Sequence, residues 1–82
     1  MPHLDNCRGI LRRLIAEADP NAIPMVETAI NECLEWTPPG ARKSGLRLLQ
    51  EDVLAQCDAG VGAQRSFAET VNAYIEKKVA EG

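Results

Sequence analysis

Three cysteines and one histidine are the side chains of this sequence best suited to metal binding, nucleophilic attack or redox chemistry. Cys7, Cys33 and Cys57 are more than twenty residues apart, which matches no zinc motif, and each falls on the apolar face of a different expected helix. Cysteine in such a position packs as a small hydrophobic side chain. The number of cysteines is odd and no signal segment precedes them, which argues against disulfides. His3, the one histidine, lies in a tail that we expect to be solvated. We therefore expect no metal site, no disulfide and no catalytic cysteine.

The acidic residues offer no better basis for catalysis. Glu51 and Asp52 are adjacent, and neighbouring positions of a helix point about 100° apart, so the two carboxylates do not converge. The body of the chain contains no histidine, and a small core leaves little room for a reactive pocket. We expect the protein to be non-enzymatic and to need no cofactor.

Four segments of the chain place apolar side chains three and four residues apart, the spacing of amphipathic helices. They cover about residues 4–18, about 24–36, a third segment that ends at 59, and a fourth that begins at 66. No segment alternates apolar and polar residues as a strand does, and the short connections favour antiparallel neighbours. We therefore predict an all-α fold: a single domain over residues 1–82, with four short helices in an up-down bundle and frayed tails at 1–3 and 80–82.

Prolines and capping residues mark the ends of the first three helices. Pro20 ends the first helix at Asp19, because the proline ring keeps the preceding residue out of helical geometry. Pro24 suits the first turn of the second helix, where its missing N–H costs little. The start of the third helix stays open, because either Thr37 or Ser44 could be its N-cap.

The connection between the third and fourth helices has two further signals. Gly60 follows the last apolar residue of the third helix and is expected to adopt the left-handed conformation, with Val61 packed back on that helix. Ser66 and Glu69 have the spacing of a capping box, in which the two side chains satisfy free N–H groups of the first turn. The sequence therefore predicts that the fourth helix begins at Ser66.

A chain of 82 residues with only three aromatic side chains builds a thin core. Regular helix packing or self-association must then supply the stability that disulfides and metals supply in other small domains. We therefore expect a homodimer. Neither a signal segment nor an apolar run of membrane length is visible, so a cytoplasmic protein is expected.

Charge is distributed in blocks, although the formal net charge is only −3. Residues 21–36 contain acids and no bases, residues 37–50 contain bases and no acids, and residues 51–60 are acidic again. Alternating blocks favour self-association or a charged protein partner, whereas a nucleic-acid-binding surface is continuously basic. We therefore expect a protein partner, with no membrane or nucleic acid involved. The basic block supplies the candidate residues for electrostatic contact: Arg42, Lys43 and Arg47.

Four large apolar residues lie away from the centres of the apolar faces. A projection at 100° per residue places Ile10, Met25 and Trp36 at the margins and points Leu48 away from the apolar face of its helix. Helix bending or packing of the fourth helix could bury them, but Trp and Met are enriched at protein interfaces. We predict that these four residues bind the partner.

Together these features favour a small protein-interaction module. It would act as a regulator, inhibitor or accessory subunit that binds a partner protein, a second copy of itself, or both, through helix faces. One alternative is a helical nucleic-acid-binding protein that uses the basic segment 40–47 and the start of the third helix.

A second alternative depends on Ser44, which lies in the stretch Lys43-Ser44-Gly45-Leu46. The chain is similar to acyl and peptidyl carrier proteins in its length, acidity and helical class. That resemblance implies a carrier-like domain, in which a serine bears a phosphopantetheine arm. Carriers present an Asp-Ser-Leu motif, whereas here the Asp is missing and a glycine separates the serine from the leucine, so we assign no modification.

Overall fold

The computed structural model describes the backbone of residues 2–81 and the side chains of residues 4–81. The described chain forms four α-helices joined by short connections, and two of the connections contain a single turn of 3-10 helix. In chain order these elements are α1 (Pro2–Glu17), η1 (Pro20–Ala22), α2 (Ile23–Trp36), η2 (Pro39–Ala41), α3 (Arg42–Ala59) and α4 (Ala63–Glu81). No strand occurs within residues 2–81. The prediction of an all-α fold with four helices is confirmed.

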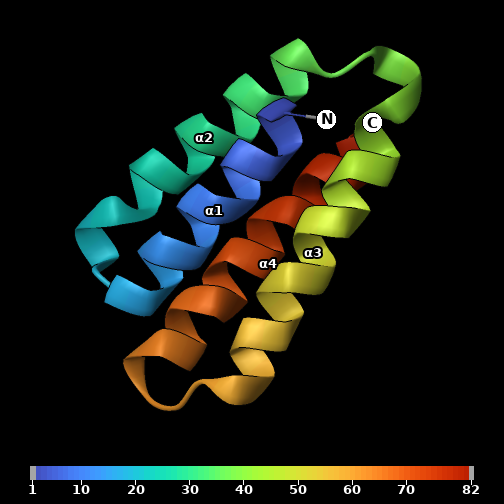
Figure 1. Cartoon of the computed structure of the whole chain (residues 1–82). Helices are drawn as coiled ribbons and strands as arrows, with labels where there is room; N and C mark the ends of the chain where they lie inside the picture. Colours follow the sequence, from blue (N-terminus) through green and yellow to red (C-terminus); the bar gives the residue numbers. More distant parts are fainter. Residues whose placement is uncertain (1, 82) are drawn as a thin grey trace.

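The helices run alternately up and down, as Figure 1 shows, and form an elongated bundle of 36 × 19 × 19 Å. The first two helices and the last two make antiparallel hairpins, and the closest pairing is between α3 and α4. The two described ends of the chain lie at the same end of the bundle (Figure 1). Because α1 contacts each of the other three helices, it joins the two hairpins into one core.

All four helices contribute apolar side chains to the core. Most apolar side chains on the faces predicted from three- and four-residue spacing are buried, and the three cysteines are free and buried with them; Leu54 of α3 is an exposed exception. The largest side chains with almost no exposed surface are Ile15, Val26, Ile30, Leu49, Val53, Val71 and Ile75. Burial of this continuous apolar surface stabilises the bundle. No helix within the described part of the chain is long and apolar enough to cross a membrane.

The predicted starts of α3 and α4 need correction. Helix α3 begins at Arg42, so neither Thr37 nor Ser44 is its N-cap. Instead, the hydroxyl of Thr37 is buried and donates to the carbonyl oxygen of Cys33 at 2.7 Å, which satisfies the C-terminus of α2. The Pro-Pro-Gly stretch forms η2 directly before α3, and Ser44 lies inside the first turn of the new helix.

The turn between α3 and α4 also differs from its prediction. Gly60 is extended, with φ −87° and ψ 160°, and the left-handed residue is Gly62, with φ 62°. A Cβ atom at Gly60 would lie 3.0 Å from a backbone oxygen of Gln56, so glycine is needed there for close approach. Val61 is 81% exposed and does not pack on α3.

Helix α4 begins three residues before the predicted capping box. Its first residue is Ala63, and the backbone N–H of Ser66 already bonds to the carbonyl oxygen of Gly62 at 3.1 Å. Gln64 donates from its side chain to the carbonyl oxygen of Ala16 at 3.0 Å, which ties this extra turn to α1. The tertiary contact therefore extends the helix beyond the local signal.

The ends of the chain were expected to fray at residues 1–3 and 80–82. Helix α1 begins at Pro2 and α4 ends at Glu81, while Met1 and Gly82, as well as the side chain of His3, lie outside the described residues. The predicted stop at Asp19 is confirmed, because α1 ends at Glu17 and a side-chain oxygen of Asp19 accepts from the N–H of Asn21 at 3.0 Å.

Candidate functional site

Three of the four predicted partner-binding residues lie together on the surface formed by α1 and α2. Met25 is 60% exposed, Trp36 is 67% exposed and Ile10 is 38% exposed. Met25 and Trp36 lie eleven residues apart, about three helical turns, so they occupy the same side of α2. Ile10 projects from the adjoining side of α1. The helical projection that placed Ile10, Met25 and Trp36 at the margins of their apolar faces therefore selected residues of one surface, formed by α1 and α2.

A shallow groove runs between these side chains. Its two adjoining hollows measure about 120 Å³ and 350 Å³, and both are lined by Ile10, Ala29 and Glu32. The smaller hollow reaches Trp36, and the larger one reaches Met25. We call the two hollows together the α1/α2 groove. The small side chain of Ala29 lies between large neighbours, so the surface is indented there.

One acidic side chain of α2 lines the groove, and two more lie elsewhere on this helix. Between Ile23 and Trp36 the helix contains three glutamates and no lysine or arginine: Glu27, Glu32 and Glu35. All three are exposed, and Glu32 lines both hollows. Among the side chains described in residues 4–17, Arg13 is a base one turn after Ile10 on α1, and it lies 3.9 Å from Glu17. A ligand in the groove would therefore meet apolar side chains and negative charge.

Leu48 lies apart from this groove. It is 41% exposed and projects from α3, beside Asp52 on the side of that helix that faces α1. Because α1 lies between α3 and the groove, Leu48 is on a separate surface. The structure therefore brings three of the predicted residues together and leaves the fourth elsewhere.

The three predicted electrostatic residues have different surroundings. The Nε of Arg42 donates to the carbonyl oxygens of Leu34 at 2.9 Å and Thr37 at 3.2 Å, so this arginine caps the end of α2. Arg47 donates to the side chain of Gln50 at 2.8 Å and lies 3.7 Å from a carboxylate oxygen of Glu76. Two of the three cations therefore already hold the bundle together.

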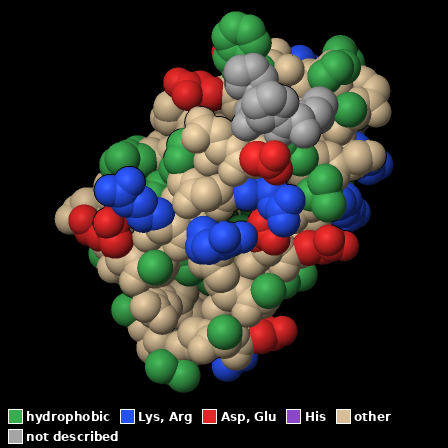
Figure 2. Space-filling model, in the orientation of Figure 1, with side chains coloured by type: hydrophobic (Ala, Val, Ile, Leu, Met, Phe, Trp, Pro, Cys, Tyr) green, Lys and Arg blue, Asp and Glu red, His purple; other side chains and the backbone are tan. Residues whose placement is uncertain are grey.

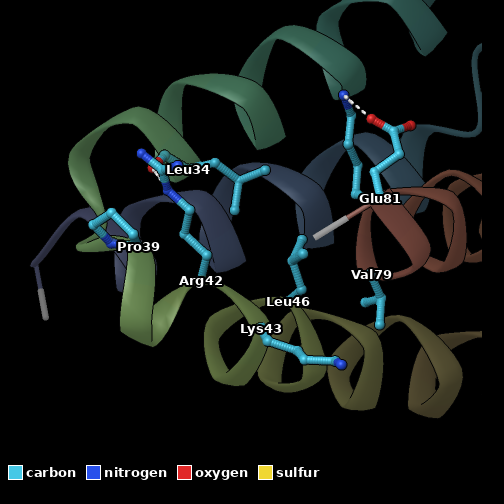
Figure 3. A pocket seen from close by; sticks show the side chains of 8 residues that line it. Leu34, Pro39, Arg42, Lys43, Leu46, Val79 and Glu81 are labelled. Carbon is cyan, nitrogen blue, oxygen red and sulfur yellow. Dashed lines mark hydrogen bonds and ion pairs between the residues drawn. The ribbon is translucent and has the colours of Figure 1, made fainter.

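Lys43 borders a cavity of about 340 Å³ at the end of the bundle, where α2 ends and α3 begins. Leu34, Leu46 and Val79 form its apolar part, and Arg42 reaches toward Leu34 while Lys43 extends in another direction (Figure 3). Lys78, which also lines the cavity, lies 3.8 Å from Glu81 and 5.4 Å from the centre of the Tyr74 ring. The cations around this cavity therefore do not converge on one point.

Figure 2 shows neighbouring basic side chains near the middle of this face, with acidic side chains beside them. An ion pair joins α1 to α3: Arg8 Nε lies 2.6 Å from one oxygen of Asp52, and Arg8 Nη2 lies 3.2 Å from the other. The hydrogen bond from Arg8 holds the pKa of Asp52 below its usual value. Asp52 is thus an anchor between helices, and its neighbour Glu51 is exposed.

The Asp52–Arg8 pair predicts a pH dependence of stability. Because the pKa of Asp52 is lower in the folded than in the unfolded protein, its contribution is complete above about pH 4 and disappears as pH falls through the lowered folded pKa. We expect Asp52→Asn to lower the melting temperature at pH 6–7 and to have a much smaller effect near pH 2. Thermal unfolding of both proteins across this range measures the difference. A gap that does not change with pH would contradict this assignment.

Cys7 and Cys33 meet beneath the α1/α2 groove, which the sequence analysis did not predict. Both line the smaller hollow, and the Sγ of Cys7 lies 3.7 Å from the carbonyl oxygen of Ala29, one turn before Cys33. Burial and the neighbouring thiol of Cys33 raise the pKa of Cys7 to about 12. The sequence does contain a signal for this pairing. Cys7 and Cys33 are equally far before and after Pro20, and such positions face one another in a helical hairpin.

Comparison of the chain with protein-family models, with curated proteins and with solved structures finds no match. Within residues 4–81, no group of three or more histidine, cysteine, aspartate or glutamate side chains is arranged to hold a metal ion. The α1/α2 groove, with its apolar rim, its glutamate and its pair of thiols, is therefore the candidate site that the geometry defines.

Proposed function

We propose that the protein is an interaction module that binds a partner protein in the α1/α2 groove. The observation that carries this proposal is the gathering of Ile10, Met25 and Trp36, all exposed, around one continuous indentation. Large apolar side chains around a concave surface are typical of the centre of an interface, where Trp in particular supplies much of the binding energy. Such a module would act as a regulator, inhibitor or accessory subunit.

The charge of α2 indicates the chemistry of the partner. An amphipathic helix with an apolar face and flanking lysines or arginines would fit the groove, because a cation would meet Glu32 there and α2 contains acids and no bases. A second copy of this chain fits less well, because symmetric pairing through this face would bring two acidic α2 helices together. We therefore favour a basic helix of another protein over the homodimer.

No observation favours the two other functions considered. A nucleic-acid site at 40–47 would depend on Arg42 and Arg47, which are engaged with α2 and with Gln50. A carrier-like function would depend on Ser44, which lies in the first turn of α3 without the motif of the carriers.

The proposal is tested with two synthetic helical peptides of equal length. Both have leucines at the spacing of one helix face; one has lysines beside the leucines and the other has glutamates. We expect isothermal titration calorimetry to detect binding of the lysine peptide only, because α2 repels the other. Trp36→Ala should weaken this binding at least about tenfold, which corresponds to about 1.4 kcal/mol.

Val61 provides a matched control for the substitution. It is apolar and 81% exposed, but it lies between α3 and α4, away from the groove. Val61→Ala should leave the affinity unchanged. The proposal is wrong if both peptides bind equally, if neither binds, or if Trp36→Ala and Val61→Ala have the same effect.

A further inference from the structure

Two thiols from different helices form part of the lining of the α1/α2 groove. Cys7 of α1 and Cys33 of α2 line the same hollow, and each stands on the buried side of its helix. The Cys7 sulfur contacts the backbone of α2 at Ala29, one turn before Cys33. Cys57, the third cysteine, is buried on α3 and lines none of this groove.

From this arrangement we propose that Cys7 and Cys33 form a reversible disulfide when the protein is exposed to a small hydroperoxide. The disulfide would join α1 to α2 directly beneath the groove. A bond between these residues requires no exchange of partners and no second copy of the chain, because the two cysteines already face one another in the hairpin.

The hollow above the thiols supplies a route for a small oxidant. Its volume of about 120 Å³ is several times the roughly 30 Å³ that one water molecule occupies in the liquid. Hydrogen peroxide is only slightly larger than water and can enter such a space. Because both sulfurs are buried, larger oxidants such as glutathione disulfide would react more slowly.

The proposed reaction has two steps. The same disulfide forms whichever thiol reacts first; with Cys33 first, its thiol loses a proton to give the thiolate, the form that attacks peroxide. The Cys33 thiolate attacks one oxygen of hydrogen peroxide, which breaks the O–O bond and produces a sulfenic acid and hydroxide, and the hydroxide takes up the proton that the Cys33 thiol lost to become water. The Cys7 sulfur then attacks the Cys33 sulfur and displaces its hydroxyl group, which takes the Cys7 proton and leaves as water. In total, two thiols and one peroxide become one disulfide and two waters.

The disulfide would change the shape of the groove, because both sulfurs line its smaller hollow. Control of partner binding by oxidation rests on the proposed function, whereas formation of the bond does not. The two ideas can therefore fail independently: peptide binding tests the groove, and mapping of the disulfide tests the thiols.

Peptide mapping of the full-length protein after treatment with hydrogen peroxide tests the disulfide. Trypsin cleaves after lysine and arginine and places the three cysteines in three different peptides, over residues 1–8, 14–42 and 48–65. We expect the intact monomer to lose two hydrogens and the digest to contain peptide 1–8 linked to 14–42. Dithiothreitol should reverse both changes.

The third cysteine gives the matched control. Cys57→Ala should form the same linked peptide to the same extent as the unmodified protein, whereas Cys7→Ala and Cys33→Ala should lose it completely. Oxidation in denaturant should produce all three pairings, which shows that the selectivity depends on the fold. Links to Cys57, links only between separate chains, or oxidation of the thiols with no 1–8/14–42 link would overturn the proposal.

Discussion

Ile75→Ala is expected to lower the free energy of unfolding by about 2–5 kcal/mol, the usual cost of removing most of a large buried aliphatic side chain. Ile75 has no exposed surface and stands on α4, which contacts each of the other three helices. The loss includes the transfer energy of the missing methylenes and the cavity left between helices that cannot fully close. Because a domain of this size has a total stability of about 5–15 kcal/mol, the substitution would remove a large share.

Unfolding in urea, followed by circular dichroism at the helical band, measures this effect. Leu54→Ala is the matched control, because Leu54 is also an aliphatic residue inside a long helix but is exposed on α3. Truncation of Leu54 should cost about 1 kcal/mol or less, since less buried surface is removed than at Ile75 and no closed cavity is left. Equal losses for the two variants would contradict the core described here.

The first two helices could be predicted from the sequence because local signals agree with the fold. Their apolar residues repeat at helical spacing, and prolines stand where one helix must end and the next begin. The predicted starts of the third and fourth helices were wrong, because the expected capping residues make other contacts or are preceded by a further helical turn. The hydroxyl of Thr37 closes the helix before it, and the side chain of Gln64 holds an additional turn of α4 against α1.

The candidate site, like the helices, could be predicted from the sequence only in part. Helical projection correctly placed Ile10, Met25 and Trp36 at the margins of their faces, but it gives only an angle around one helix axis. It does not indicate which neighbouring helix lies beside each residue, so it could not separate Leu48 from the other three. Nor could composition reveal that Arg42 would cap α2, because that role depends on the path of the Pro-Pro-Gly connection.

The two facing thiols were missed for a different reason. Each cysteine was considered by its own helix face and by the spacing of zinc motifs, and both views treat it as an isolated residue. The pairing becomes visible only when the hairpin is folded about Pro20, which brings Cys7 beside the last turns of α2. Two residues at matching distances from the turn of a predicted hairpin can thus be expected to face one another, which neither residue shows by itself.

Oxidation of this pair is expected to stabilise the protein strongly. A bond between Cys7 and Cys33 closes a loop of about 25 residues, which lowers the entropy of the unfolded chain and is worth about 3–4 kcal/mol in the loop-closure model. Urea unfolding of the peroxide-treated protein should therefore show a higher midpoint than that of the reduced protein, with reversal by dithiothreitol.

Cys33→Ala treated with the same amount of peroxide controls for oxidation elsewhere, including at Met25, which is exposed. Its midpoint should not rise. If the linked protein were less stable than the reduced one, the bond would be forming at the expense of helix packing, and α1 and α2 would have to move apart or rotate to reach it. A rise in stability with unchanged helicity would instead mean that the folded hairpin already holds the two sulfurs where the bond requires them, so that oxidation alters the hollow that they line and leaves the helix packing unchanged.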